Sequence, residues 1–344
     1  MREVFEFWDR ETANPVLQSW MANADVRRYI NRSTSGDDHA SALDYFQPLL
    51  TRPGGRALSI GCGTGAFERE LVRRGVVAAV DAFDGSLLSL AAARRAAAEA
   101  GYASQLRYFA ADFDALVLRE GAYDLVVAHQ SLHHVTELER LYATIMTALK
   151  PDGMLYFDEY VGPSRFDWND RVIAPQRAVY TLLPAHVRRH EKLLLPIQQD
   201  DPSEAARSSE ILRLLGIGFD VVERKDYGGN LLSVLFPAID WSRADENLAR
   251  ELIERERALL GAGASAFHTV VLARPKRGAA REAALRQYAR AGWRSRIGRR
   301  VMPAVRTARG LTKRVGPALM RRLRALVVRF RRSVAPAQID GRST

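Results

Sequence analysis

Cysteine is nearly absent from this sequence of 344 residues, which contains Cys62 alone. A single cysteine excludes a disulfide framework and a metal site built from several cysteines. No apolar run of about 18 residues occurs, so we expect no transmembrane helix. The first residues, MREVFEFWDRE, lack the basic and then apolar stretches of a signal peptide. We therefore expect a cytoplasmic location.

Acidic residues are scarce at the C-terminal end. Residues 274–344 contain 21 Lys and Arg residues but only Glu282 and Asp340 as acids, which gives a net charge of +19. The whole chain has a net charge of +11, so the preceding residues are mildly acidic. We expect residues 275–344 to form a basic, partly helical tail beyond the last strand of the fold, so that truncation after Lys276 leaves a folded protein.

Short apolar runs alternate with helical patterns through the middle of the chain. The runs predict strands at 56–61, 76–84, 106–112, 123–129 and 154–162. Between them the spacing predicts helices at 66–74, 86–100 and 137–149. This alternation is typical of an α/β fold, in which helices cover both faces of a parallel sheet. Two later runs predict strands at 219–227 and 266–274.

A glycine-rich turn joins the first predicted strand to its helix. Gly61, Gly63 and Gly65 allow a tight turn and bring the backbone close to a ligand at a helix N-terminus. Asp84 ends the second strand, where a carboxylate can accept hydrogen bonds from both hydroxyls of a ribose. A dinucleotide enzyme has the same two features, so they do not identify the cofactor by themselves.

Three further segments distinguish between the possible cofactors. They are AADFD at 110–114, YDLVVAHQSLHHV at 123–135 and LKPDGMLYFDE at 149–159. With ALSIGCGTG and FDGSLLSLAAA, they resemble the class I S-adenosylmethionine-dependent methyltransferases that act on small molecules, over roughly residues 55–160.

The resemblance implies a doubly wound, seven-stranded, mostly parallel sheet with a terminal antiparallel hairpin. It also implies a small-molecule acceptor and S-adenosylmethionine as cofactor. The implied cofactor-binding residues are Gly61, Cys62, Gly63, Gly65, Asp84, Ala111, Asp112, Phe113 and His129. On this basis we expect a helical cap at 1–50 and a methyltransferase domain at 51–274, with a substrate-shaping insertion at 163–215.

One position departs from the family pattern. The family has Asp or Glu two residues before the first glycine, where it helps to hold the methionine end of the cofactor, and this chain has Ser59. Glu68, one helical turn into the next helix, is a candidate to compensate.

The candidate catalytic residues follow the fourth and fifth strands. Methyl transfer needs positioning and exclusion of water, and an oxygen acceptor also needs a general base. Imidazole suits that role near pH 7, so we expect the base to be His133 first and His134 next. Glu159 and Tyr160 are rivals, and the histidines could instead shape the cofactor pocket. The expected acceptor atom is oxygen, on a sugar or a glycolipid-type molecule.

Other assignments stay open from the sequence. A NAD(P)-dependent oxidoreductase is disfavoured because no Tyr-x-x-x-Lys pair follows the fourth strand, and Ser59 is the one hint of a catalytically inactive scaffold. We expect no metal site. Asp201, Glu204 and Arg207 either cap a helix, which we favour, or line the acceptor pocket.

The tail offers one candidate partner surface. In the stretch at 318–332, Leu323, Val327 and Phe330 share one helical face and arginines fill much of the rest. This pattern fits an anionic membrane surface, which would make the protein peripheral at the inner membrane face. The alternatives are nucleic acid, for which we expect no specific binding, and a solvated extension.

Overall fold

The computed structural model describes residues 7, 9, 19–197, 201 and 203–292. Among these residues, no helix combines the length and apolarity that crossing a bilayer requires. The predicted amphipathic stretch at 318–332 lies outside the described residues.

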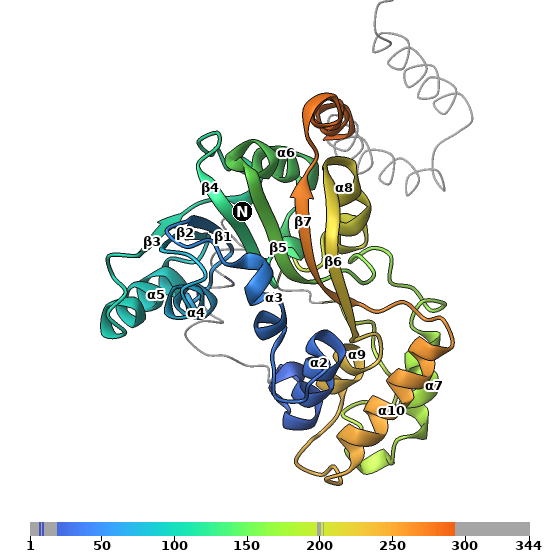
Figure 1. Ribbon diagram of the computed structural model, residues 1–344. Coiled ribbons are helices and arrows are strands. Elements are labelled where there is room, and N and C mark those ends of the chain that lie inside the picture. The colour runs from blue at the N-terminus through green and yellow to red at the C-terminus, as the bar shows by residue number, and fades with distance from the viewer. Residues whose placement is uncertain (1–6, 8, 10–18, 198–200, 202, 293–344) are drawn as a thin grey trace, which may run out of the picture. The chain divides into compact units, whose positions relative to one another are not determined.

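A seven-stranded sheet organises the described chain (Figure 1), in the order β3-β2-β1-β4-β5-β7-β6. Strands β1 to β5 are parallel, and β7 runs antiparallel to both β5 and β6. The predicted fold class, including the terminal antiparallel pair, is therefore confirmed. The strands are β1 (Arg56–Ile60), β2 (Ala79–Asp84), β3 (Leu106–Ala110), β4 (Tyr123–His129), β5 (Leu149–Tyr160), β6 (Phe219–Gly228) and β7 (His268–Pro275).

Helices connect the strands and extend the fold beyond the carboxyl ends of the parallel strands. The α-helices are α2 (Ala24–Ser35), α3 (Ala42–Leu50), α4 (Ala66–Arg73), α5 (Leu87–Glu99), α6 (Leu138–Ala148), α7 (Ala174–Leu182), α8 (Ile211–Gly218), α9 (Leu232–Leu235) and α10 (Leu248–Gly261). The short 3-10 helices are η1 (Trp20–Ala22), η2 (Phe113–Ala115), η3 (Leu132–His134), η4 (Ala185–Val187), η5 (Ser208–Glu210) and η6 (Phe236–Ala238).

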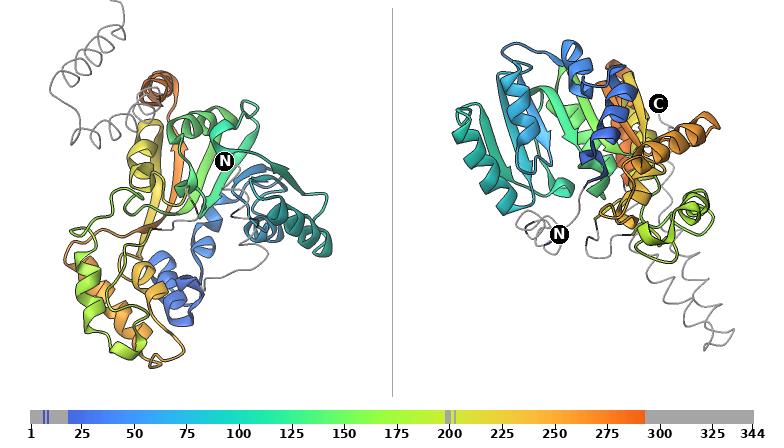
Figure 2. Two further views of the ribbon diagram at one scale, coloured as in Figure 1. Left: turned by 180° about the vertical axis from the view of Figure 1, so that it is seen from behind. Right: turned by 90° about the horizontal axis from the view of Figure 1, so that it is seen from below.

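Two apolar layers sandwich the sheet, because alternate residues of each strand point to opposite faces. In β4, Leu125 and Val127 belong to one buried cluster, with apolar residues of α3, α4 and α5. Val126 and Ala128 belong to the other, with α6 and α8. The views in Figure 2 show these helix groups on opposite sides of the sheet. This arrangement leaves the carboxyl ends of the parallel strands as the edge at which a ligand can bind.

The fold differs from the predicted boundaries at two places. Strand β5 begins at Leu149, so the predicted turn at 151–153 lies inside it, where the pairing with β4 shifts register. At the other end, a helix over 278–292 follows β7. Its Tyr288 is 1% exposed, stacks on Tyr142 and donates a hydrogen bond to the carbonyl of Leu214 at 2.8 Å.

Residues 278–292 therefore belong to the packed fold rather than to a tail beyond the last strand, and the effect of removing them stays a prediction. The basic composition of this stretch hides an amphipathic helix. Its buried residues Ala284 and Tyr288 complete the apolar layer over α6 and α8.

Candidate active site at the carboxyl ends of the parallel strands

The glycine turn after β1 has the conformation that only glycine adopts without strain. Gly61, Gly63 and Gly65 have φ values of 68°, 49° and 72°. A Cβ on Gly61 would collide with the side chain of Ser131, and one on Gly65 would lie 2.5 Å from the hydroxyl oxygen of Tyr108. The turn thus presents backbone to the space above it and leads into the N-terminus of α4.

Asp84 anchors the facing side of the same space. Its Oδ2 accepts a hydrogen bond from the backbone N–H of Gly63 at 2.8 Å, and its Oδ1 accepts one from the N–H of Ser86 at 2.8 Å. Burial raises the pKa of the Asp84 carboxyl group. Ser86 caps α5, and its hydroxyl donates to Asp9 of the N-terminal segment at 2.5 Å.

A cavity of about 280 Å³ opens between these elements. Its walls include six of the sequence-predicted cofactor residues, namely Gly61, Cys62, Gly63, Asp84, Phe113 and His129. Gly65 shapes the turn beneath it, and Ala111 lies at the end of β3. The carboxylate of Asp112 instead caps η2, accepting from the N–H of Asp114 at 2.8 Å. Gln130, Ser131, His134 and Ser203 complete the far wall.

Ser59 and Glu68 form a buried pair below the glycine turn. The Ser59 hydroxyl donates a hydrogen bond to Oε1 of Glu68, and Glu68 is only 1% exposed. Burial raises the pKa of the Glu68 carboxyl group, and its Oε2 has no hydrogen-bond partner among the described residues. The chain therefore has a carboxyl group beside position 59, although it is attached to α4.

Glu159, on β5, organises the loop that carries the histidines. Its Oε2 accepts hydrogen bonds from the backbone N–H groups of Ser131 and Leu132 at 2.8 and 2.6 Å. Its Oε1 accepts one from the N–H of Tyr160 at 2.7 Å and is paired with Nδ1 of His133. Glu159 is 0% exposed and does not line the cavity above the glycine turn, so it acts on the site through His133.

The two adjacent histidines have opposite electrostatic environments. Burial by itself lowers the pKa of His133, but the carboxylates of Glu159 and Glu204 outweigh it and raise the pKa to about 9. For His134, burial and the charge on His133 together lower the pKa to about 4. Burial would raise the pKa of Glu159, and the charge of His133 and their hydrogen bond bring it below its usual value.

A second cavity, of about 680 Å³, meets the first at this pair. Gln130 lines both, His134 and Ser203 line the first, and His133 and Glu204 line the second. Oε2 of Glu204 lies 3.8 Å from Nε2 of both histidines. The junction therefore places His133 where a bound cofactor and a second molecule would meet.

The backbone is strained on both sides of that junction. Among the described residues other than glycine, positive φ values occur at Gln130, with 52°, and Ala205, with 49°. Such conformations are costly for residues with a Cβ and cluster at functional sites. Gln130 is held by hydrogen bonds from its Nε2 to Oδ1 of Asp158 at 3.0 Å and to the hydroxyl of Tyr227 at 3.2 Å.

The same cluster has the donor types of a metal site. One ligand atom each of His133, His134 and Glu204 lies within 4.8 Å of the others. The sequence did not indicate this group, because Glu204 is distant in the chain and was expected to cap a helix. Arg207, by contrast, forms a bidentate ion pair with Glu139, with distances of 2.7 and 2.8 Å.

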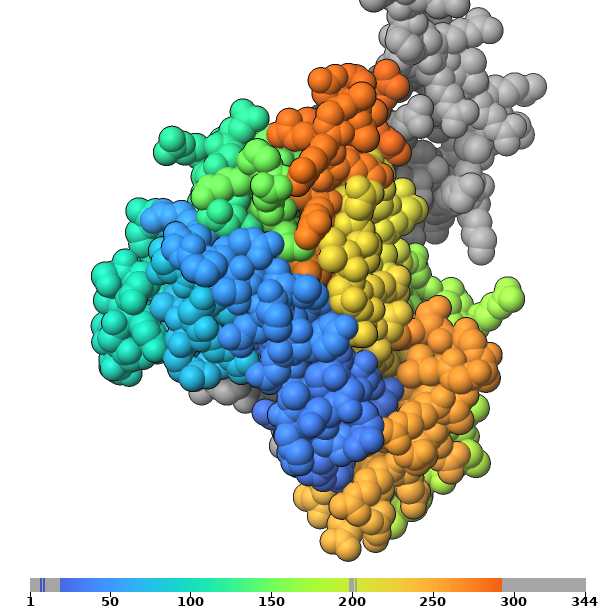
Figure 3. Space-filling model, viewed as in Figure 1, coloured from blue at the N-terminus to red at the C-terminus, as the bar shows by residue number. Residues whose placement is uncertain are grey.

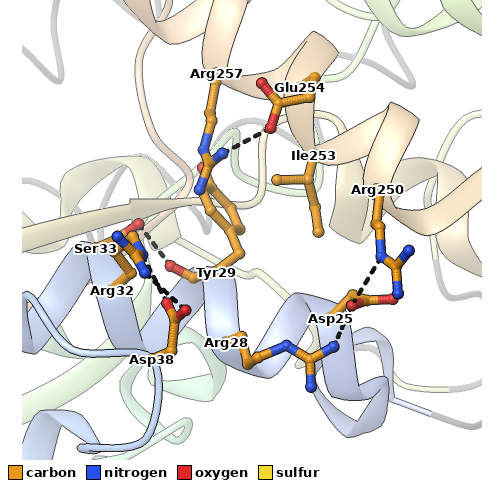
Figure 4. A pocket seen from close by; sticks show the side chains of 10 residues that line it. All are labelled: Asp25, Arg28, Tyr29, Arg32, Ser33, Asp38, Arg250, Ile253, Glu254 and Arg257. Carbon is orange, nitrogen blue, oxygen red and sulfur yellow. Dashed lines mark hydrogen bonds and ion pairs between the residues drawn. The ribbon is translucent and has the colours of Figure 1, made fainter. Parts of the chain in front are cut away.

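A further opening, of about 640 Å³, lies between α2 and α10. The two helices border each other on the face shown in Figure 3. Figure 4 shows that the side chains around the opening pair with one another: Arg28 and Arg250 with Asp25, Arg32 with Asp38, and Arg257 with Glu254. Because its charges are already paired and no residue of the glycine turn lines it, this opening is not the candidate active site.

Comparisons with known proteins agree with this geometry. Residues 58–157 match the family model described as a methyltransferase domain. Over 116 residues the chain is 33% identical to the ubiquinone biosynthesis O-methyltransferase of Ralstonia nicotianae, a match that covers 33% of this chain and 47% of that protein. Over 255 residues it is 21% identical to the sterol 24-C-methyltransferase of Schizosaccharomyces pombe, covering 66% of this chain and 63% of that protein.

The chain thus spans less than two thirds of the length of these curated relatives. Among solved structures, it is similar to the geranyl diphosphate C-methyltransferase of Streptomyces coelicolor, with a TM-score of 0.47 and 15% identity. That match covers 79% of this chain and 97% of the other.

Proposed function

We propose that the core of this chain is a class I S-adenosylmethionine-dependent methyltransferase domain, and that the protein transfers a methyl group from S-adenosylmethionine to an oxygen atom of a small-molecule acceptor. The match of residues 58–157 to the methyltransferase-domain model supports this proposal. The observation that carries this proposal is the position of His133. Its imidazole stands at the junction of the two cavities and is paired with a fully buried carboxylate.

The residues of the first cavity fit the cofactor. The glycine turn leaves room that a Cβ would fill, and Asp84 presents a carboxylate to the ribose hydroxyls. Glu68 is not among the residues that line this cavity, but its Oε2, buried without a partner below the glycine turn, is the acceptor we assign to the amino group at the methionine end. Glu68 would then take over the role of the acid that is missing at Ser59.

In this proposal the chain contributes positioning and proton removal. S-adenosylmethionine, when bound, supplies a methyl group activated by its sulfonium. The neutral form of His133 accepts the proton of the acceptor hydroxyl at Nε2 as the O–CH₃ bond forms and the S–CH₃ bond breaks. Glu159 holds Nδ1 and stabilises the imidazolium that results, and His133 then releases the proton to solvent. The products are the methyl ether and S-adenosylhomocysteine.

Two measurements test the proposal. Calorimetric titration should show binding of S-adenosylmethionine and not of NAD, and binding of NAD alone would favour the oxidoreductase alternative. On an acceptor found by screening phenols, alcohols and sugars, His133→Ala should lower turnover about 10²–10⁴-fold while cofactor affinity is kept. His186→Ala, at an exposed histidine of η4, is the matched control.

Three results would change the assignment. Equal loss of cofactor binding in His133→Ala would make His133 part of the pocket wall. Unchanged turnover would move the role of base to His134. Cofactor binding without methyl transfer to any acceptor in the screen would favour the inactive scaffold.

We also propose that the basic tail brings the enzyme to anionic membrane surfaces. The support is its sequence alone, because residues 293–344 are outside the described structure. Full-length protein should float with anionic vesicles, and Leu323→Glu with Phe330→Glu should abolish membrane insertion. No flotation at any anionic lipid fraction would leave the tail a solvated extension.

A further inference from the structure

The second cavity carries information about the acceptor. We propose that it takes an uncharged molecule with a largely apolar body and a hydroxyl group at one end, rather than a free sugar or a phosphorylated compound. This inference rests on the proposed function, because it assigns the cavity to the acceptor of methyl transfer. The volume of about 680 Å³ is within the range of about 300–1,000 Å³ that small-molecule sites occupy.

Apolar side chains from separate parts of the chain form the body of the cavity. Trp20 and Trp168 contribute two aromatic walls, and they are 8% and 7% exposed. Leu193, Leu194 and the rest of the segment to 197 form a third wall, within the predicted insertion. Val234, Pro237 and Ala238 form a fourth, outside it. A sugar carries hydroxyl groups around its ring, and most of these hydroxyls would find no hydrogen-bond partner on these walls.

Polar groups gather at the end that meets the cofactor cavity. They are Gln130, His133, Tyr160, Glu204 and His268, whereas His190 and Ser233 line the cavity next in sequence to the third and fourth walls. His268 is packed among aromatic rings, with centroids 5.1 Å from Trp20 and 5.3 Å from Tyr160. Its Nε2 is buried without a hydrogen-bond partner among the described residues. Most polar side chains of the cavity therefore lie at one end, which favours a ligand whose polar end is placed there.

The charge of the lining disfavours an anionic acceptor. No Lys or Arg is among the described residues that line the cavity, and the carboxylate of Glu204 offsets the charge of protonated His133. A phosphate or diphosphate would need guanidinium, ammonium or several backbone N–H donors to replace its hydration. The Glu204 carboxylate, 3.8 Å from Nε2 of His133, can stabilise the imidazolium that forms when His133 accepts the proton of a hydroxyl held there.

Calorimetry with 4-alkoxyphenols of increasing chain length tests this assignment. Each phenol is titrated with and without S-adenosylhomocysteine, and n-octyl phosphate and glucose are the comparison ligands. The dissociation constant should fall about fourfold for each added methylene until the cavity is full, because each one leaves water for an apolar wall. The phosphate and the sugar should not bind measurably.

A matched pair of variants locates the binding. Leu194 lines the cavity and is 60% exposed, and Leu182 on α7 is 68% exposed and does not line it. Leu194→Glu should weaken 4-octyloxyphenol binding about tenfold, whereas Leu182→Glu should not change it. Both should bind S-adenosylhomocysteine as the wild type does. Because both positions are exposed, neither change should unfold the protein.

The outcomes separate the two proposals. Three results would overturn the proposal of an apolar acceptor and leave cofactor binding unaffected. They are phenol binding that does not depend on chain length, phenol binding that Leu182→Glu weakens equally, and tighter binding of octyl phosphate. Chain-length dependence without any binding of S-adenosylhomocysteine would keep the apolar site and overturn the proposed methyl transfer.

Discussion

The buried pair of His133 and Glu159 allows a direct test of the proposed base. Replacing Glu159 by Gln removes the negative charge while nearly keeping the size of the side chain. In the wild type, the carboxylates of Glu159 and Glu204 raise the pKa of His133 from 6.5 to about 9 against the effect of burial. Without the Glu159 charge, burial should dominate and bring the pKa of His133 below 6.5.

The pKa of His133 should therefore fall by more than 2 units in Glu159→Gln. At about 1.4 kcal/mol per unit, this corresponds to roughly 3 kcal/mol of interaction with the protonated imidazole. The direction in which stability changes with pH follows from the linkage between proton binding and folding. Because the pKa of His133 is higher in the folded protein than in the unfolded chain, this stabilisation is fully present below pH 6.5 and is lost as the pH rises through 9. Glu159→Gln should remove that pH-dependent part of the free energy of unfolding.

The variant should also be less stable at every pH. Glu159 accepts hydrogen bonds from the backbone N–H groups of Ser131, Leu132 and Tyr160 as well as pairing with His133. An amide oxygen cannot accept from all of these donors, and each buried donor left unsatisfied costs about 1–3 kcal/mol.

Nuclear magnetic resonance of isotope-labelled imidazoles measures the pKa of His133 and does not require a methyl-acceptor substrate. The His133 signals, assigned by comparison with His133→Ala, should titrate near pH 9 in the wild type and below pH 6.5 in Glu159→Gln. Glu191→Gln, at an exposed glutamate, should change neither. Once an acceptor is known, wild-type turnover should rise with pH towards 9, as His133 loses its proton. A wild-type His133 that titrates at or below pH 6.5, or that does not respond to Glu159→Gln, would refute the reasoning.

Three other perturbations have defined outcomes. Asp84→Ala should weaken S-adenosylmethionine binding by about 1–3 kcal/mol in calorimetry, because the ribose hydroxyls lose a buried partner; unchanged affinity would exclude Asp84 from the cofactor site. Truncation after Gly292 should leave the thermal melting midpoint nearly unchanged, whereas truncation after Lys276 should cost about 3–5 kcal/mol of stability through loss of Tyr288; equal melting midpoints would contradict this. Chelation by EDTA should not change methyl transfer if His133 is the base, and activity lost and then restored by a divalent cation would assign the histidine cluster to a metal.

The sequence was sufficient to predict the sheet because its signals are local. Each parallel strand is a short apolar run next to an amphipathic helix, as at 123–129, whose predicted and observed bounds agree. The start of β5 was missed because the pattern Pro-Asp-Gly at 151–153 is typical of a turn, and its pairing with β4 depends on tertiary contacts. Tyr288 was missed because the arginines around it outnumber the apolar residues of its helix.

The candidate site was predictable where a single segment supplies it. The glycine turn, Asp84 and His133 follow strand ends, and each was a candidate from the sequence. Gln130 was not, and Glu204 was a candidate for the acceptor pocket that we placed behind a helix-capping role, because the roles of both residues depend on where separate loops meet. Glu159 was expected as a rival base, and its burial behind His133 instead favours a positioning role, which no strand pattern could indicate.

The left-handed backbones at Gln130 and Ala205 have a consequence for engineering the protein. Glycine adopts such conformations without steric cost, so Gln130→Gly and Ala205→Gly would relieve strain that the native residues store. The gain would be partly offset by the greater freedom of glycine in the unfolded chain. Gln130→Gly would also delete the side chain that ties the end of β4 to Asp158 and Tyr227. Consensus or computational design for thermostability, which favours glycine at positive φ, would therefore loosen the wall between the two cavities.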